Sequence, residues 1–177
     1  MIKLDDKIIL RKPEHRDAAD LLDVKNNKTA AALLGGYRER DYTEEDIHKW
    51  IDFHNNNTDE IIYVIYDIAM DRVVGHVGFY NIDRRVRKAE FAIRIGNDAC
   101  RGRGYGSLCL NYFIELGFDN LNLNRIELTL LKENNTAMKL YERFGFVVEG
   151  IQKQAQFKNG RYYDVVLMAL LRENYAK

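Results

Sequence analysis

The order of hydrophobic and polar residues predicts β-strands and amphipathic helices in a mixed arrangement. A β-like run at residues 7–11 opens the chain. Apolar residues then recur every three or four positions at residues 14–26 and again after Thr43, where a threonine followed by acidic residues is typical of a helix start. Three further β-like runs predict an antiparallel meander, because only short connections separate them. They lie at residues 61–68, 73–82 and 89–95.

The second half of the chain alternates between helix-like and strand-like spacing. A helical stripe of apolar residues begins at Tyr105 and continues to Leu116. Asn159-Gly160 separates the last two predicted strands, and this dipeptide favours the positive φ angles of a tight hairpin turn. The predicted elements after the stripe are a strand at 125–131, a helix at 136–144, and strands at 146–157 and 161–171.

The resulting order, β-α-α-β-β-β-α-β-α-β-β, predicts an α/β (α+β) protein with a mixed sheet and helices on its faces. Residues 93–131 form a strand–helix–strand unit, whose crossover should be right-handed with its two strands parallel. A chain of 177 residues that is 46% hydrophobic can build a sizeable core. We therefore expect residues 1–177 to form one domain.

Composition argues against several classes of function. The 27 basic and 27 acidic residues balance, so no overall charge favours nucleic acid or a membrane surface. The longest apolar run, at residues 165–171, is too short to span a bilayer, and no signal-peptide pattern opens the chain. Cys100 and Cys109 show neither CxxC spacing nor a disulfide framework, and the histidines show no metal-ligand spacing. These features predict a cytoplasmic protein without a metal site.

The stretch Arg101-Gly102-Arg103-Gly104-Tyr105-Gly106-Ser107 lies between a predicted strand and a predicted helix. Its glycines allow close approach to the backbone, and the following helix directs free N–H groups and its positive dipole end into the turn. With two arginines, this pattern favours a diphosphate-binding site. A P-loop would need a Lys-Ser or Lys-Thr pair, and a dinucleotide-binding turn would need glycine in place of Ser107, so neither fits. A glycine turn that serves packing alone stays open as the alternative.

Two motifs resemble those of the GNAT superfamily of N-acetyltransferases. The pattern Arg101-x-x-Gly104-x-Gly106 is similar to its pyrophosphate motif. The stretch from Asn134 to Phe146, which contains Ala137, Tyr141 and Gly145, resembles a second segment of the superfamily. Residues 157–168 are similar to the branch of ribosomal-protein alanine and spermidine acetyltransferases. The resemblance implies a mostly antiparallel sheet of about seven strands, with a splayed central parallel pair and helices on both faces.

The resemblance also implies acetyl-CoA as the acetyl donor, with no metal. Its pantetheine arm would lie between the separated strands, pair with backbone groups of Ile93 and Ile95, and form a hydrogen bond with Asn134. A backbone N–H at or beside Ile93 would polarise the thioester carbonyl. The diphosphate would rest on the turn residues Arg101, Gly102, Arg103, Gly104, Tyr105, Gly106 and Ser107.

Two side chains are candidates for moving protons. An amine with a pKa of about 10 is mostly protonated at pH 7, so direct attack on a thioester needs a proton acceptor. Glu90 is the candidate base, and a surface carboxylate in an ion pair is the equal alternative. Tyr141 occupies the superfamily's general-acid position, where it would protonate the leaving thiolate. Core packing is the rival for Tyr141, because it shares a helical stripe with Leu140 and Phe144.

The expected acceptor is the primary amine of a small molecule, an amino sugar or a polyamine. It should enter opposite the donor, between the first two helices, their connection at residues 35–40 and the last hairpin. Arg38 and Arg40 interrupt the acidic stretch that spermidine enzymes carry there, which favours an acceptor with phosphate or carboxylate.

Two other classes of function stay open. One is a protein N-terminal or lysine acetyltransferase of the ribosomal-protein type, and the other is a module that binds acetyl-CoA without catalysis. A homodimer or larger homo-oligomer is compatible with the sequence, and neither nucleic acid nor a membrane is an expected partner.

Overall fold

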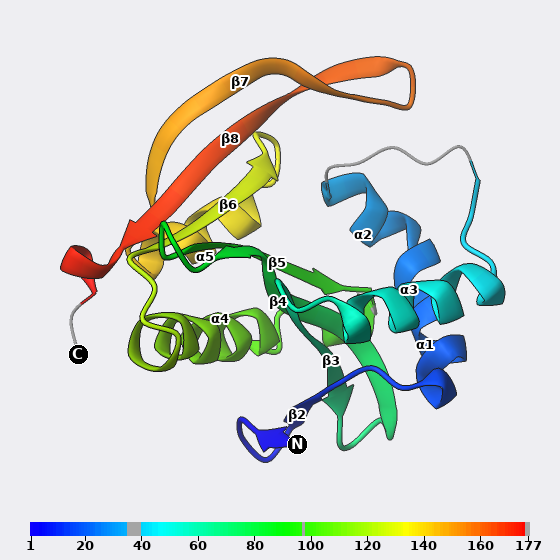
Figure 1. The fold of residues 1–177 in the computed structure, drawn as a ribbon. Helices are drawn as coiled ribbons and strands as arrows, with labels where there is room; N and C mark the ends of the chain where they lie inside the picture. The colour runs from blue at the N-terminus through cyan, green and yellow to red at the C-terminus, as the bar shows by residue number, and fades with distance from the viewer. Residues whose placement is uncertain (35–39, 97, 176–177) are drawn as a thin grey trace.

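The computed structural model describes residues 1–34, 40–96 and 98–175. Within these ranges, eight strands form one sheet in the order β1-β2-β3-β4-β5-β6-β8-β7 (Figure 1). The strands are β1 (Ile2–Lys3), β2 (Ile8–Arg11), β3 (Ile61–Asp67), β4 (Arg72–Asp83), β5 (Lys88–Ile95), β6 (Arg125–Leu131), β7 (Val147–Lys158) and β8 (Arg161–Leu171). The helices are α1 (Ala18–Asn26), α2 (Lys28–Leu33), α3 (Glu44–Asn56), α4 (Tyr105–Glu115) and α5 (Asn135–Arg143).

The strand directions confirm the predicted fold class. Neighbouring strands are antiparallel except for β5 and β6, which are parallel. The sheet is therefore mixed and mostly antiparallel, with helices on both faces. The structure adds β1 and α2, which the sequence pattern did not predict, because two and six residues are too few to show a periodicity.

Two hydrophobic clusters lie on opposite faces of the sheet. Successive side chains of a strand point to opposite faces, and β3 shows the consequence. Val64 packs with α1 and α3 in the smaller cluster. Ile65 belongs to the larger cluster, which contains the apolar faces of α4 and α5. We call these two faces of the sheet the α1–α3 face and the α4–α5 face.

Local sequence signals act as predicted at two places. Thr43 caps α3, since its hydroxyl accepts from the backbone N–H of Asp46 at 3.3 Å and the Asp46 carboxylate accepts from the Thr43 N–H at 2.8 Å. Asn159 and Gly160 take φ angles of 50° and 77° between β7 and β8. This long hairpin arches away from the rest of the sheet (Figure 1). No helix in the described ranges is long and apolar enough to cross a membrane.

Candidate active site

The parallel pair β5–β6 separates partway along its length. Its ladder has three residue pairs and ends where Glu90 lies opposite Glu127. Beyond this point β5 continues to pair only with β4, through Ile95, while β6 pairs with β8. The β6-facing edge of β5 therefore carries backbone N–H and C=O groups that no strand of the described chain satisfies. We call this opening the β5–β6 gap. Ile93 and Ile95 lie along it, with their side chains against the larger hydrophobic cluster.

The glycine turn at residues 101–107 opens directly into α4. Gly104 precedes the helix with a φ of 85°, and no side chain caps the helix start. The first backbone hydrogen bond of the helix runs from the Leu108 N–H to the Gly104 carbonyl at 3.1 Å. The N–H groups of Tyr105, Gly106 and Ser107 thus have no intrahelical acceptor and point out of the helix end. Free N–H groups at a helix N-terminus are suited to bind an anion.

The surroundings of the turn are open on one side and tightly packed on the other. A Cβ atom added to Gly102 or Gly104 would meet nothing within 4 Å. A Cβ on Gly106 would lie 3.3 Å from the Leu140 side chain, so this glycine lets α4 approach α5 closely. The Arg101 guanidinium pairs with Asp98 at 3.1 Å, and its side chain is 34% exposed.

Tyr141 combines a buried ring with an unpaired hydroxyl. The residue is 7% exposed, and its ring packs edge-on against Phe91, with the centroids 6.3 Å apart. Phe91 is the first residue of β5 beyond the ladder, so Tyr141 lies beside the β5–β6 gap on the α4–α5 face. The Tyr141 hydroxyl makes no hydrogen bond within the described part of the chain. Burial raises the pKa of Tyr141 to about 12, so the hydroxyl stays protonated at neutral pH.

Glu90 lies at the same point of β5 but on the opposite face. It is Phe91's neighbour in an extended strand, so its side chain points towards the α1–α3 face. Its carboxylate accepts a hydrogen bond from the Asn81 side chain at 3.2 Å. Lys88 pairs with Glu127 instead, at 2.7 Å. Among the described residues, no basic side chain pairs with Glu90. The alternative for Glu90, a surface carboxylate in an ion pair, predicts such a partner.

Asn134 is engaged with protein groups in this structure. Its side-chain oxygen caps α5 by accepting from the Ala137 N–H at 3.2 Å. Its amide donates to the Leu33 carbonyl at the end of α2, at 3.1 Å. The expected hydrogen bond between Asn134 and pantetheine stays a prediction.

Polar and aromatic side chains that the sequence pattern did not reveal gather on the α1–α3 face near the gap. His76 of β4 is 8% exposed, and neither ring nitrogen has a hydrogen-bond partner among the described residues. Its ring lies 5.0 Å from that of Trp50 in α3. Burial and the nearby cations Lys25 and Arg94 lower the pKa of His76 well below its usual value. A single histidine between Gly75 and Val77 gives no motif, so only the register, which places His76 opposite Arg94, reveals this cluster.

The end of α2 borders the same region. The Lys158 ammonium, at the tip of the β7–β8 hairpin, donates to the carbonyls of Ala31 and of Leu34, the latter at 2.9 Å. This contact and the one from Asn134 bring the hairpin, α2 and the start of α5 together. The α1–α2 region and the last hairpin are thus neighbours, as expected of an acceptor site. The expected contribution of Gly35, Gly36, Tyr37, Arg38 and Glu39 falls on residues outside those described. Arg40 pairs with Asp46 at 2.7 Å.

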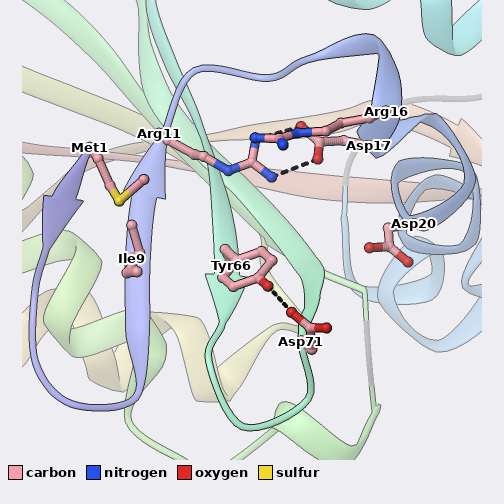
Figure 2. Close-up of a pocket in the computed structure, with 8 residues that line it drawn as sticks. All are labelled: Met1, Ile9, Arg11, Arg16, Asp17, Asp20, Tyr66 and Asp71. Carbon is pink, nitrogen blue, oxygen red and sulfur yellow. Dashed lines mark hydrogen bonds and ion pairs between the residues drawn. The ribbon is translucent and has the colours of Figure 1, made fainter.

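A surface pocket elsewhere on the molecule is unrelated to this site. It has a volume of about 380 Å³ and is lined by Met1, Ile9, Arg11, Arg16, Asp17, Asp20, Tyr66 and Asp71 (Figure 2). Its walls come from Met1, β2, β3, the turn between β3 and β4, and the start of α1, at the sheet edge away from the gap. Two of its charged groups pair with each other: the two Asp17 oxygens each accept from Arg11 at 2.7 Å. Within the described ranges, no three His, Cys, Asp or Glu side chains are placed to hold a metal ion.

A parallel strand pair that separates beside a helix start with free N–H groups, with a protonated tyrosine at the gap, has the architecture of an acyltransferase. Comparison with known proteins agrees: residues 7–147 match the family model described as the acetyltransferase (GNAT) domain. The chain belongs to the GNAT family and is an N-acetyltransferase.

One relative resembles the chain over nearly the whole length of both proteins. Spermidine N(1)-acetyltransferase from Vibrio cholerae serotype O1 is 30% identical over 173 residues, which cover 97% of each chain. The crystal structure of the Vibrio cholerae enzyme in complex with CoA and spermine superposes with a TM-score of 0.84, at 30% identity, and the match covers 97% of this chain and 99% of that one. A dodecameric structure of the same enzyme gives a TM-score of 0.80 at 30% identity over 98% of each chain.

Proposed function

We propose that this N-acetyltransferase transfers the acetyl group of acetyl-CoA to the primary amine of a small molecule by direct attack on the thioester. The observation that carries the proposal is the β5–β6 gap, whose unpaired backbone edge runs beside the free N–H groups of α4. Five extended residues from Phe91 to Ile95 span about 16 Å, which suits an extended arm that carries amide groups. The Vibrio cholerae relative binds CoA in a closely similar fold, which supports the same donor.

The donor would use two kinds of backbone group. The N–H groups of Tyr105, Gly106 and Ser107 would donate hydrogen bonds to the diphosphate, and Arg101 and Arg103 would add positive charge. The pantetheine amides would pair with the free edge of β5 at Ile93 and Ile95, as an added strand does. A backbone N–H at or beside Ile93 would then donate to the thioester oxygen, where negative charge develops during attack.

Glu90 and Tyr141 would act from opposite faces of β5. Glu90, on the α1–α3 face, would take a proton from the acceptor's ammonium group, directly or through water. The amine would attack from that face. Tyr141, on the α4–α5 face, would donate its hydroxyl hydrogen towards the departing sulfur. The two groups would thus serve the nucleophile and the leaving group separately.

A polyamine is the first acceptor to test, because the full-length relative is a spermidine acetyltransferase. One observation favours a second candidate, an amino sugar that carries phosphate or carboxylate. Arg94 and Lys158 border the acceptor side, and neither forms an ion pair with a carboxylate in the described chain. Arg94 instead donates to the carbonyls of Val24 and Lys25 at 3.0 and 2.7 Å.

The test is a thiol-release assay with acetyl-CoA and a panel of acceptors. Spermidine, spermine, nucleotide-linked amino sugars, amino acids and short peptides would be compared at equal concentration. We expect turnover with one class of small amine. Turnover with peptides alone would favour a protein acetyltransferase. Binding of CoA without thiol release from any acceptor would favour a non-catalytic module.

We also propose that the chain assembles into a homo-oligomer. The Vibrio cholerae relative has been solved as a dodecamer. In this chain the edge strand β7 exposes a row of apolar side chains: Val147, Val148, Ile151 and Phe157, with exposed fractions of 42–59%. An exposed apolar edge strand is suited to pair with a second copy. Light scattering after gel filtration tests the mass in solution.

A further inference from the structure

Asp67, the last residue of β3, is a completely buried carboxylate, 0% exposed. Burying a charged carboxylate is costly unless donors surround it. The Oδ1 atom accepts from the backbone N–H groups of Ala69 and Met70, both at 3.0 Å. These two bonds shape the tight turn between β3 and β4 and satisfy one of the two oxygens.

The other oxygen of Asp67 faces the segment that forms the glycine turn. Oδ2 accepts from the Tyr105 hydroxyl at 2.6 Å. The Cys100 thiol lies 3.9 Å from the same oxygen, and the Arg103 guanidinium lies 3.8 Å from it. Within the described chain, every side-chain contact of Oδ2 comes from residues 100–105. A strand two positions away from the gap is therefore bonded to the start of α4.

The turn needs such an anchor because its own residues hold it weakly. Gly102 and Gly104 take φ angles of 74° and 85°, and a Cβ on either would touch nothing. Glycine has the largest conformational freedom to lose on ordering. Tyr105 provides the fixed point, since its side chain is 2% exposed while its N–H is one of the free donors of α4. One residue thus joins the protein interior to the anion-binding end of the helix.

The charge of Asp67 is compensated without using up the arginine of the turn. Although burial opposes ionisation, the Tyr105 hydroxyl and the Met70 and Ala69 amides hold the pKa of Asp67 below its ordinary value. The Arg103 guanidinium is 3.8 Å away, which is longer than a hydrogen bond, and its side chain is 46% exposed. Arg103, whose pKa is raised chiefly by the Tyr105 hydroxyl, therefore shields the carboxylate from an incoming anion and keeps its remaining donors for that anion.

We propose that Asp67 is a positioning residue for the acetyl donor: through the Tyr105 hydroxyl it fixes the direction in which the first N–H groups of α4 meet the diphosphate. The inference rests on the proposed function, in which the diphosphate of acetyl-CoA occupies this turn. It assigns no chemical step to Asp67. It requires that loss of the Asp67–Tyr105 bond weakens the binding of acetyl donors that carry a diphosphate and leaves the binding of acetyl donors without a diphosphate unchanged.

The decisive variant is Tyr105→Phe, which removes one oxygen and leaves Asp67 with its amide partners. Binding of CoA is measured by calorimetry, and KM and kcat are measured with acetyl-CoA and with S-acetylpantetheine, which lacks the diphosphate. We expect Tyr105→Phe to raise the Kd for CoA about tenfold, because binding would then have to order the turn. The kcat at saturating acetyl-CoA and the KM for S-acetylpantetheine should stay at wild-type values. At temperatures at which its melting curve shows that Asp67→Asn is folded, this variant should show the same selective loss of affinity for CoA.

Tyr112→Phe is the matched control, because Tyr112 lies on the same helix and its hydroxyl contacts Tyr63 rather than the turn. It should leave the Kd for CoA unchanged. An unchanged Kd in Tyr105→Phe, or an equal loss with both acetyl donors, would overturn the inference, since a merely structural bond would not distinguish the donors. A wild-type protein that fails to bind CoA would refute the proposed function instead.

Discussion

Replacing Tyr141 by phenylalanine tests the chemistry at the β5–β6 gap most directly. The pKa of Tyr141 is raised to about 12, whereas a thiol has a pKa of about 8.5. Complete proton transfer from tyrosine to thiolate is therefore uphill by about 3.5 pKa units, or about 5 kcal/mol. The hydroxyl instead stabilises the developing thiolate as a hydrogen-bond donor. Such a bond to a charged group contributes about 1.5–3 kcal/mol, so Tyr141→Phe should lower kcat roughly 10- to 100-fold.

Stopped-flow thiol release under single-turnover conditions measures this loss at the chemical step. The Kd for acetyl-CoA should not change, because the phenylalanine ring keeps the packing against Phe91 and Phe146. The melting temperature should not fall, since the hydroxyl has no partner to lose in the described chain. Tyr63→Phe, which changes a hydroxyl in the same hydrophobic cluster away from the gap, is the control. A wild-type kcat in Tyr141→Phe would leave the ring with a packing role alone and remove it from the reaction.

Three further changes probe the base, the turn and the buried histidine. Glu90→Gln should lower kcat/KM about 100-fold at pH 7. In a pH profile this loss should shrink towards the amine's pKa of about 10, because the acceptor is already neutral there. A loss that is constant with pH would contradict a role for Glu90 as base, and Glu127→Gln is the control. Gly104→Ala should destabilise the fold by about 1 kcal/mol and raise the Kd for CoA, because alanine disfavours the φ of 85°. Gly104→Asn should reduce both the stability and the affinity for CoA less than Gly104→Ala does. Equal effects of the two variants would show that this angle is not the cause. The pKa of His76 is lowered in the folded state, so the protein should be fully stable above pH 6.5 and lose stability as the pH falls below it. His76→Leu should flatten the dependence of stability on pH in this range. An unchanged slope of stability against pH would assign the acid sensitivity to other groups.

The sequence predicted those parts of the protein that depend on neighbouring residues in the chain. Alternating and helical spacings located the main strands and helices because each element buries one face. The glycine turn was predicted in the same way, since its residues are contiguous. Tyr141 was proposed because residues 134–146 resemble a segment of the superfamily, and its helical spacing alone predicts core packing. The short α2 escaped prediction because Lys28–Leu33 contains too few residues to show a period.

The remaining parts of the site depend on contacts between distant residues. The Tyr105–Asp67 bond joins residues 38 apart, and the Asn134–Leu33 bond joins residues 101 apart. No local pattern marks Asp67, which looks like an ordinary turn aspartate after a strand. Likewise, only the register of His76 opposite Arg94 shows that this histidine lies near the β5–β6 gap. Side-chain partners across a sheet are fixed by topology, and topology follows from the whole chain.

Opposing contacts on the two strands explain why β5 and β6 separate where they do. β5 is held on its far side, because Arg94 donates to the α1 carbonyls of Val24 and Lys25 and a Cβ on Gly96 would lie only 2.4 Å from the Val24 Cα. Gly75 of β4 also follows β5 closely, since a Cβ there would lie 2.3 Å from the Arg94 carbonyl oxygen. β6 is drawn the other way by its antiparallel ladder with β8, which runs along its whole length. The gap is therefore maintained by the protein's own packing, and a donor that enters it meets a backbone edge already separated from its neighbour.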